Sequence, residues 1–246
     1  MPRIEDLTVK LFSDGADMQS ILRLSANPWI RGFTTNPTLM RKAGVADYEN
    51  FGRALLRAIP DRPVSLEVFA DDEDEMEDQA LTIAGWGPNV NIKIPITNRQ
   101  GIFPERLIRR LSSAGVTLNI TAILTLDQVK RTVDALAPSS PAIVSVFAGR
   151  IADTGIDPVP VMRAARELLS LHPGAELLWA SPRELLNVFQ ANDAGCHIIT
   201  VPSEMLQKLS LIGKDLTAYS LETVDMFYQD ARAAEYRIRS AVMQPV

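Results

Sequence analysis

The sequence predicts a single (β/α)8 barrel, the α/β fold in which eight parallel strands alternate with helices. Eight short β-like runs recur along the chain, and each is followed by a helix-length segment. Most runs are continuously apolar, as expected for parallel strands covered by helices. The runs occupy residues 9–14, 32–36, 64–69, 90–95, 116–123, 142–149, 176–181 and 197–202.

The segments between the runs carry helix signals. Residues 128–136 are amphipathic, and Asp157-Pro158 places a capping side chain before a proline at the first helical position. Ser181-Pro182-Arg183-Glu184 has the spacing of a capping box. A doubly wound open sheet is the alternative fold, but no Gly-x-Gly-x-x-Gly follows the first predicted strand.

A further helix is predicted after the eighth unit, over residues 216–238. Met226-Phe227-Tyr228 gives this helix an apolar surface, so it packs over the barrel or docks on a neighbouring subunit. We therefore expect residues 1–238 to form one domain that includes this helix, and residues 239–246 to form a flexible tail.

The composition excludes several classes of function. The chain of 246 residues is 46% hydrophobic with a net charge of −5, which argues against nonspecific nucleic-acid binding. The N-terminus lacks the apolar core of a signal peptide, and no apolar run is long enough to span a membrane. A single cysteine, Cys196, excludes an internal disulfide, and two histidines offer little for a transition-metal site. We expect a cytoplasmic protein.

Seven successive predicted strands carry polar residues at or near their C-terminal ends, where barrels of this kind place their active sites. These residues are Asp14, Asn36, Glu67, Lys93, Asn119 with Thr121, Ser145 with Arg150, and Ser181 with Arg183. Singly, they also have structural explanations as caps (Asp14, Ser181), a turn (Asn36), an ion-pair partner (Glu67), strand residues (Thr121, Ser145) or surface charges (Arg150, Arg183). Seven unrelated structural explanations at the same face of the barrel are less credible than a single site formed by these residues.

Lys93 stands in the middle of an apolar run, between Ile92 and Ile94. Burying an unpaired ammonium is costly, and a lysine that loses its proton becomes a nucleophile toward carbonyls. A lysine that reaches a strand end, or that pairs with an acid, is the structural alternative. The polar residues at the neighbouring strand ends favour the nucleophile.

The chemistry that fits these residues is imine catalysis on a phosphorylated sugar. Lys93 would attack a ketose carbonyl and form a protonated Schiff base, and Asp14 would act as the base during carbon–carbon cleavage. Glu67 would shuttle protons, with Thr121 holding a water. Hydroxyl groups would be held by Asn36, Asn119 and Ser145, and a terminal phosphate by Arg150 and Arg183, helped by a helix start at Ser181.

Six spaced motifs carry a family resemblance over nearly the whole chain. They are Gly-Phe-Thr-Thr-Asn-Pro-Thr (32–38), Val-Ser-Leu-Glu-Val (64–68), Ile-Lys-Ile-Pro (92–95), Leu-Asn-Ile-Thr-Ala (118–122), Ser-Val-Phe-Ala-Gly-Arg-Ile (145–151) and Ala-Ser-Pro-Arg (180–183). The chain resembles the transaldolases, in the short subfamily that also contains the fructose-6-phosphate aldolases. The resemblance implies a class I aldolase-type TIM barrel with the Schiff-base lysine at Lys93, and no cofactor or metal.

Two positions bear on which branch of the family the chain resembles. Transaldolases carry glutamate on the third strand where the simple aldolases carry glutamine, and this chain has Glu67. Where the aldolases use a tyrosine near the end of the sixth strand to position water, this chain has Phe147. Asn119 also follows the transaldolase pattern. These residues indicate transfer of a dihydroxyacetone unit to an aldose phosphate, with an aldolase that releases free dihydroxyacetone as the nearest alternative.

The resemblance does not indicate which sugars the enzyme uses. It is compatible with a role in pentose-phosphate metabolism and with a role in a specialised sugar pathway. It also implies a homo-oligomer, such as a ring or decamer bridged by the C-terminal helix. Trp179 departs from the family pattern, either as a residue that fills the barrel's middle layer or as one that raises the pocket floor. Asp-Gly-Ala-Asp (14–17) departs too, although Asp14 is retained. Cys196 and His197 are expected to be structural.

Two other classes remain as rivals. A barrel kept as a binding or assembly module would have lost Lys93, Asp14 or Glu67, and all three are present. A metal- or phosphate-dependent barrel enzyme of another kind is disfavoured by the scarcity of histidine.

Overall fold

A computed structural model of the chain, which describes residues 3–238, contains eight parallel strands that close into a barrel in sequence order. The predicted (β/α)8 fold is confirmed. The strands are β1 (Lys10–Asp14), β2 (Ile30–Thr34), β3 (Val64–Glu67), β4 (Val90–Pro95), β5 (Leu118–Ile123), β6 (Ala142–Val146), β7 (Ala175–Trp179) and β8 (Ile198–Pro202).

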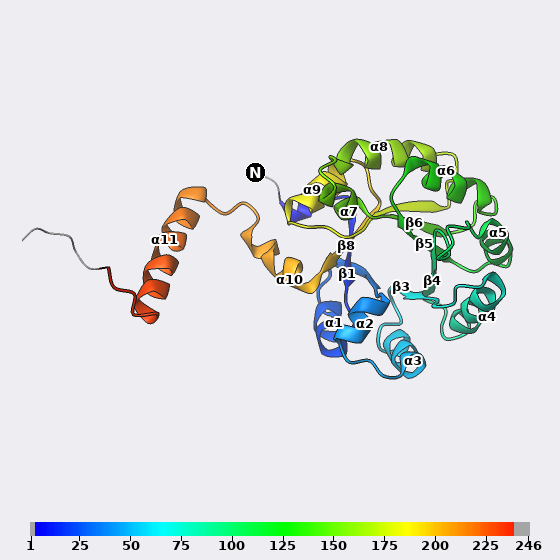
Figure 1. The fold of residues 1–246 in the computed structure, drawn as a ribbon, viewed down its shortest axis with the longest axis horizontal. Helices are drawn as coiled ribbons and strands as arrows, with labels where there is room; N and C mark the ends of the chain where they lie inside the picture. The colour runs from blue at the N-terminus through cyan, green and yellow to red at the C-terminus, as the bar shows by residue number, and fades with distance from the viewer. Residues whose placement is uncertain (1–2, 239–246) are drawn as a thin grey trace, which may run out of the picture.

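Helices form a ring around the strands (Figure 1). The α-helices of this ring are α1 (Met18–Ser25), α2 (Pro37–Lys42), α3 (Tyr48–Ala58), α4 (Glu73–Ala84), α5 (Glu105–Ser113), α6 (Leu126–Ala135), α7 (Ala148–Asp153), α8 (Pro158–Leu169) and α9 (Leu186–Asp193). A 3-10 turn, η1 (Ile4–Asp6), precedes β1, and α10 (Ser203–Leu206), η2 (Gln207–Leu211) and α11 (Leu216–Ala233) follow β8.

Four strands, β2, β3, β6 and β7, end earlier than the apolar runs suggested. β2 stops at Thr34 because the side chain of Asn36 caps α2, accepting a 3.0 Å hydrogen bond from the Leu39 N–H. Pro37 then occupies the first helical position, where its missing N–H costs nothing. β6 stops at Val146 because α7 begins at Ala148.

The predicted helix starts are partly correct. Asp157 caps α8 and accepts a hydrogen bond from the Val159 N–H. The capping box predicted at Ser181 is wrong, because α9 begins only at Leu186. Ser181 instead has a φ of 60°, and the Asn187 side chain accepts hydrogen bonds from the Arg183 and Glu184 N–H groups.

The core has two parts, as the alternation of side chains in a barrel requires. A large cluster packs the outward face of the strands against the helices, and a small cluster inside the barrel contains Phe12, Ile143, Leu178, Ala180 and Ile198. A Cβ on Gly32 would lie 2.5 Å from the ring of Phe12. The glycine therefore makes room for this ring inside the barrel.

Trp179 belongs to the outer cluster, so both placements predicted for it inside the barrel are wrong. It is fully buried between β7 and the helices, whereas its neighbours Leu178 and Ala180 point inward. The prediction placed Trp179 on the same strand face as Ser181, two residues later. The two residues do not share a face, because β7 ends at Trp179 and the positive φ at Ser181 breaks the alternation.

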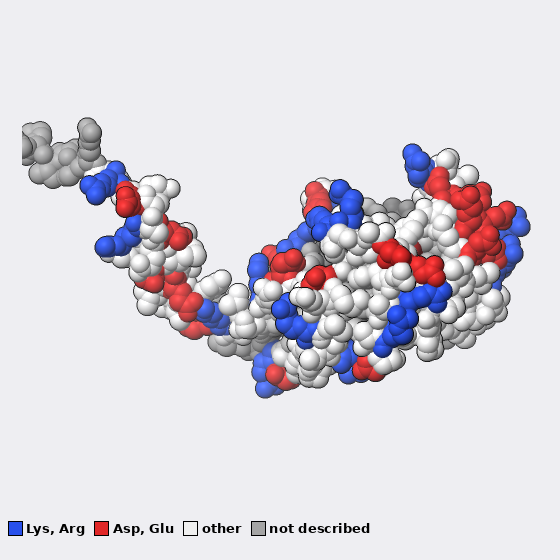
Figure 2. Space-filling view, turned by 90° about the horizontal axis from the view of Figure 1, so that it is seen from below, with Lys and Arg blue, Asp and Glu red and all other residues white. Residues whose placement is uncertain are grey.

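Helix α11 extends away from the barrel and buries none of its residues (Figures 1 and 2). The alternative in which this helix packs over its own barrel is therefore wrong. The predicted tail, residues 239–246, lies outside the described residues. No helix in the described part of the chain is long and apolar enough to cross a membrane.

Candidate active site

A cavity of about 490 Å³ opens at the C-terminal ends of the strands. It brings together all eleven side chains selected from the sequence: Asp14, Asn36, Glu67, Lys93, Asn119, Thr121, Ser145, Phe147, Arg150, Ser181 and Arg183. Leu178 and Ala180 of the inner cluster also line it, so the barrel interior below is filled by apolar side chains.

Lys93 projects into this cavity from the middle of β4. Its flanking residues, Ile92 and Ile94, are fully buried in the outer core, so strand alternation turns the lysine inward. Only 8% of the side chain is exposed, and Nζ lies 2.9 Å from Oε2 of Glu67. Nζ also donates a 2.7 Å hydrogen bond to the Thr35 carbonyl oxygen. The ammonium is thus paired while facing a cavity wide enough for a small ligand.

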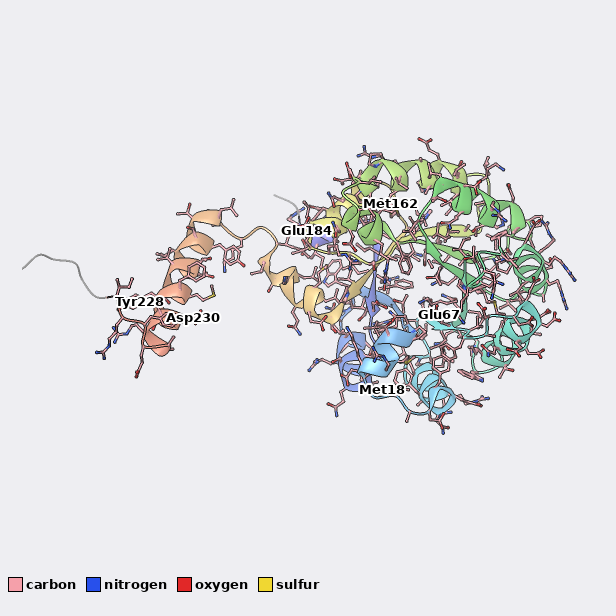
Figure 3. All side chains as sticks on the ribbon, viewed as in Figure 1. Met18, Glu67, Met162, Glu184, Tyr228 and Asp230 are labelled. Atoms are coloured by element: carbon pink, nitrogen blue, oxygen red, sulfur yellow. The ribbon has the colours of Figure 1, made fainter. Side chains whose placement is uncertain are left out.

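Glu67 reaches Lys93 because β3 and β4 pair in parallel with these two residues in register. Figure 3 shows Glu67 at the inner side of the helix ring. The carboxylate is therefore the group best placed to exchange a proton with the amine.

Asp14 ends β1 on the other side of the cavity, and it does not cap α1, because Asp17 does. Its Oδ1 accepts a 2.7 Å hydrogen bond from the Thr34 hydroxyl, which also lies 2.5 Å from the Thr200 hydroxyl. Burial raises the pKa of the Asp14 carboxyl, and the nearby Lys93 charge and the Thr34 bond oppose this rise. A carboxylate with a raised pKa is a stronger base than an exposed one.

Asn119 is held by hydrogen bonds on both sides. The Ser145 hydroxyl of β6 donates a 2.6 Å bond to the Asn119 Oδ1, and the Asn119 Nδ2 donates a 3.1 Å bond past β4 to the hydroxyl of Ser65 on β3. All three side chains are buried. This chain of bonds fixes the orientation of the Asn119 amide at the cavity floor.

The two arginines follow the ends of β6 and β7, with Arg150 in α7 and Arg183 in the loop before α9. Arg183 forms a bidentate pair with Asp153, through a 2.9 Å bond from Nε to Oδ1 and a second contact from Nη2 to Oδ2. This guanidinium lowers the pKa of the Asp153 carboxyl. The guanidinium of Arg150 lies 5.9 Å from the Phe147 ring centroid. No helix start at Ser181 assists them, since α9 begins five residues later at Leu186.

Four further residues belong to the site and were not selected from the sequence. Thr34, Thr200 and Lys42 line the cavity, and Ser65 holds Asn119. Thr200 stands near the end of the eighth strand, so the rule that found the other seven strand ends would also have found it. Lys42 lies in the last turn of α2 and carries no such signal.

A second hollow of about 600 Å³ lies at the opposite end of the barrel. Its charged residues include the ion pair of Lys10 with Glu176 at 2.5 Å. Cys196 and His197 also lie at this end, just before β8. Burial raises the pKa of the Cys196 thiol to about 12, which leaves it unreactive.

Comparison with known proteins identifies the family. A model of the family described as "Transaldolase/Fructose-6-phosphate aldolase" matches residues 11–242. The chain belongs to this family. A "Probable transaldolase" of Dehalococcoides mccartyi is 34% identical over 205 residues, which cover 82% of this chain and 90% of that protein. A "Probable transaldolase" of Streptococcus agalactiae is 34% identical over 216 residues, covering 87% of this chain and 95% of that protein.

Two solved structures with low sequence identity share the barrel fold. A dihydrodipicolinate synthase from Rhodopseudomonas palustris superposes with a TM-score of 0.57 at 14% identity, covering 94% of this chain and 81% of that one. A structure titled "Native KDPGal structure" superposes with a TM-score of 0.54 at 13% identity, covering 78% of this chain and 82% of that one. At these identities the likeness concerns the barrel alone.

Within residues 3–238, no three His, Cys, Asp or Glu side chains are grouped so that they could hold a metal ion.

Proposed function

We propose that this member of the transaldolase family transfers a dihydroxyacetone unit from a ketose phosphate to an aldose phosphate through a Schiff base on Lys93. The donor would be a sugar such as fructose 6-phosphate or sedoheptulose 7-phosphate, and the reaction would take place in the cytoplasm. The observation that carries this proposal is the Lys93 amine, which faces the cavity and contacts the Glu67 carboxylate at 2.9 Å.

Imine formation requires the amine to lose a proton before it attacks. Glu67 would accept that proton from Lys93, and the neutral amine would then add to the ketose carbonyl to give a carbinolamine. Protonated Glu67 would return the proton to the carbinolamine hydroxyl, which leaves as water. Thr121, which also lines the cavity, would hold this water.

Carbon–carbon cleavage requires a base on the other side of the substrate. Asp14 would remove the proton from the hydroxyl of the carbon beyond the breaking bond, and the bonding electrons would pass to the iminium. The aldose phosphate would leave while the three-carbon enamine remains on Lys93. Addition of the enamine to an acceptor aldehyde, with the proton returned from Asp14, would reverse these steps and build the new ketose.

Substrate binding would use the remaining groups of the cavity. Asn36, Asn119 and Ser145 offer amide and hydroxyl groups for the sugar hydroxyls, and Arg150 and Arg183 offer guanidinium groups for a terminal phosphate. The phosphate would bind Arg183 in competition with Asp153, which already occupies one edge of the guanidinium. Lys42 adds a third cation on the opposite rim.

Transfer is favoured over release because the residue that follows β6 cannot activate a water toward the enamine. Phe147 lines the cavity at the end of β6 and has no hydroxyl group. The aldolase-like release of free dihydroxyacetone is the alternative reaction of the same site.

We also propose that the active form is a homo-oligomer in which α11 docks on a second copy of the chain. Leu221, Val224, Phe227 and Tyr228 of this helix are between 56% and 70% exposed, and their spacing of three and four residues gathers apolar surface on the helix. An isolated amphipathic helix of this kind needs a partner to bury its apolar face.

The imine can be tested directly by reduction. The protein would be incubated with fructose 6-phosphate or sedoheptulose 7-phosphate, treated with borohydride, and analysed by peptide mass spectrometry. We expect a three-carbon adduct on Lys93. Its turnover with and without erythrose 4-phosphate would separate transfer from release.

The matched controls are Lys93→Met and Lys42→Met, because both lysines line the cavity. Lys93→Met should abolish trapping, whereas Lys42→Met should retain the adduct on Lys93. An adduct on Lys42, or no adduct from either ketose, would overturn the proposed mechanism.

A further inference from the structure

The hydroxyl group of Tyr48 binds both backbone polar groups of Glu67. It donates a 2.9 Å hydrogen bond to the Glu67 carbonyl oxygen and accepts a 2.8 Å bond from the Glu67 N–H. Tyr48 is the first residue of α3 and stands 19 positions before Glu67. One side chain therefore anchors the peptide groups on either side of a candidate catalytic residue.

The need for this anchor follows from the geometry of the sheet. The Ser65 carbonyl group faces β2 and accepts a 3.2 Å bond from the Thr35 N–H. Glu67 is two residues further on and faces the same neighbour. The partner expected for Glu67 is the residue two positions after Thr35, which is Pro37. β2 has already ended at Thr34, and Pro37 has no N–H group to donate. The Tyr48 hydroxyl takes the place of the missing strand, since unpaired backbone groups are costly to bury.

The Tyr48 ring is itself held in place by aromatic neighbours. It meets the Phe69 ring edge-on with centroids 4.5 Å apart, and the Trp86 ring lies 5.9 Å away. The Arg53 guanidinium covers Trp86 at 5.3 Å. Burial raises the pKa of Tyr48, so the phenol keeps its proton and remains able to donate.

The consequence concerns the contact between Glu67 and Lys93. Glu67 is the last residue of β3, and its carboxylate lies 2.9 Å from the Lys93 amine. Beyond this residue, only the bond from the Val68 N–H to the Lys93 carbonyl continues the ladder toward β4. The Gln79 side chain accepts bonds from the Phe69 and Ala70 N–H groups, but these lie beyond Glu67. Without the Tyr48 hydroxyl, the backbone of Glu67 itself would have no partner on the β2 side, and its carboxylate would sample a wider range of positions.

We infer that Tyr48 is a positioning residue that holds Glu67 in proton-transfer distance of Lys93. This inference rests on the proposed function, in which Glu67 exchanges protons with the amine and the carbinolamine. Displacement of a catalytic group by a fraction of an ångström to one ångström lowers a rate by roughly one to two orders of magnitude.

The test is a double-mutant cycle between Tyr48→Phe and Glu67→Gln, read out as the single-turnover rate of borohydride-trapped imine on Lys93. Tyr48→Phe keeps the ring and removes only the hydroxyl, and we expect the trapping rate to fall by about tenfold. In the Glu67→Gln background the same change should alter the rate by less than about twofold, because Tyr48 would act only through the carboxylate. Tyr236→Phe, which removes an exposed hydroxyl beyond α11, is the matched control.

Hydrogen exchange of the peptide spanning 64–69 provides a measurement that does not depend on activity. Tyr48→Phe should accelerate exchange there and leave the other strands unchanged. An equal loss of rate in both backgrounds would show a general structural role and overturn the inference, as would an unchanged rate in Tyr48→Phe. Absence of any adduct in the wild-type protein would instead overturn the proposed function.

Discussion

Gly149 lies directly against the carbonyl group of Ser181. A Cβ at Gly149 would be 1.5 Å from this oxygen, and the Gly149 N–H donates a 3.3 Å bond to the Ala180 carbonyl oxygen. The contact joins the start of α7 to the segment after β7, and these two segments carry Arg150 and Arg183. The distance between the two candidate phosphate-binding arginines thus depends on a residue with no side chain.

Replacing Gly149 with alanine should disturb both stability and binding. The new Cβ meets backbone, which cannot move aside as a flexible side chain can, so we expect the free energy of unfolding to fall by about 1–3 kcal/mol. The KM for a ketose phosphate should rise as the arginines separate. Urea denaturation and steady-state kinetics measure the two effects.

Gly85→Ala is the matched control for this change. The nearest atom to a Cβ at Gly85 is 3.4 Å away, which is ordinary contact, so its stability should change little. Equal effects of the two substitutions would contradict the steric argument.

Asp14 should make stability depend on pH in the direction opposite to that of most acids. Burial raises the pKa of Asp14 in the folded state, so the folded protein binds more protons than the unfolded chain between the unfolded pKa and the raised one. Stability from this group is therefore present at low pH and is lost as the pH rises through the folded pKa. Asp14→Asn should remove that loss and make the protein more stable than wild type above this range.

Thermal unfolding of wild type and Asp14→Asn across the acidic range checks this prediction. The melting temperatures should converge at low pH and diverge as the pH rises. Activity of the wild type should increase over the same interval, since a base must be ionised to act. A pH-independent difference in melting temperature would argue that Asp14 keeps its ordinary pKa.

Arg183→Gln should weaken binding of phosphorylated substrates. The guanidinium offers paired donors that glutamine lacks, and loss of a hydrogen bond to a charged group corresponds to a KM increase of roughly tenfold or more. The kinetics of an unphosphorylated ketose should change little. Arg163→Gln, on the exposed side of α8, is the control with the same change in net charge. Equal losses for both kinds of substrate would place Arg183 in structural support of the loop.

Phe227→Asp should disrupt the proposed assembly. This side chain is 64% exposed on α11, so a charge there destabilises the isolated chain little. Burying the same charge in a subunit interface costs several kcal/mol by order of magnitude. Light scattering should report a smaller species than wild type, while circular dichroism shows an intact barrel. Gln229→Asp on the same helix is the control. A monomeric wild-type protein would remove the basis of this prediction.

The sequence by itself determined the barrel and eleven of the residues that line the cavity. Both follow from local rules: the alternation of apolar runs with helix-length segments indicates the fold, and a parallel barrel brings the C-terminal ends of all its strands to one face. Lys93 and Glu67 could therefore be assigned to one site before their contact was known.

Only the tertiary structure decided how those residues are held. The bond of Tyr48 to Glu67 and the pairing of Asp153 with Arg183 join residues 19 and 30 positions apart, and no local periodicity records such contacts. Trp179 faces outward between the inward-facing Leu178 and Ala180, and Ser181 does not share its face because the positive φ at Ser181 breaks the strand alternation. The alternation of side chains along a strand predicts which face a residue occupies only while that strand continues. Contacts at the strand ends depend instead on where the neighbouring segments of the chain turn away.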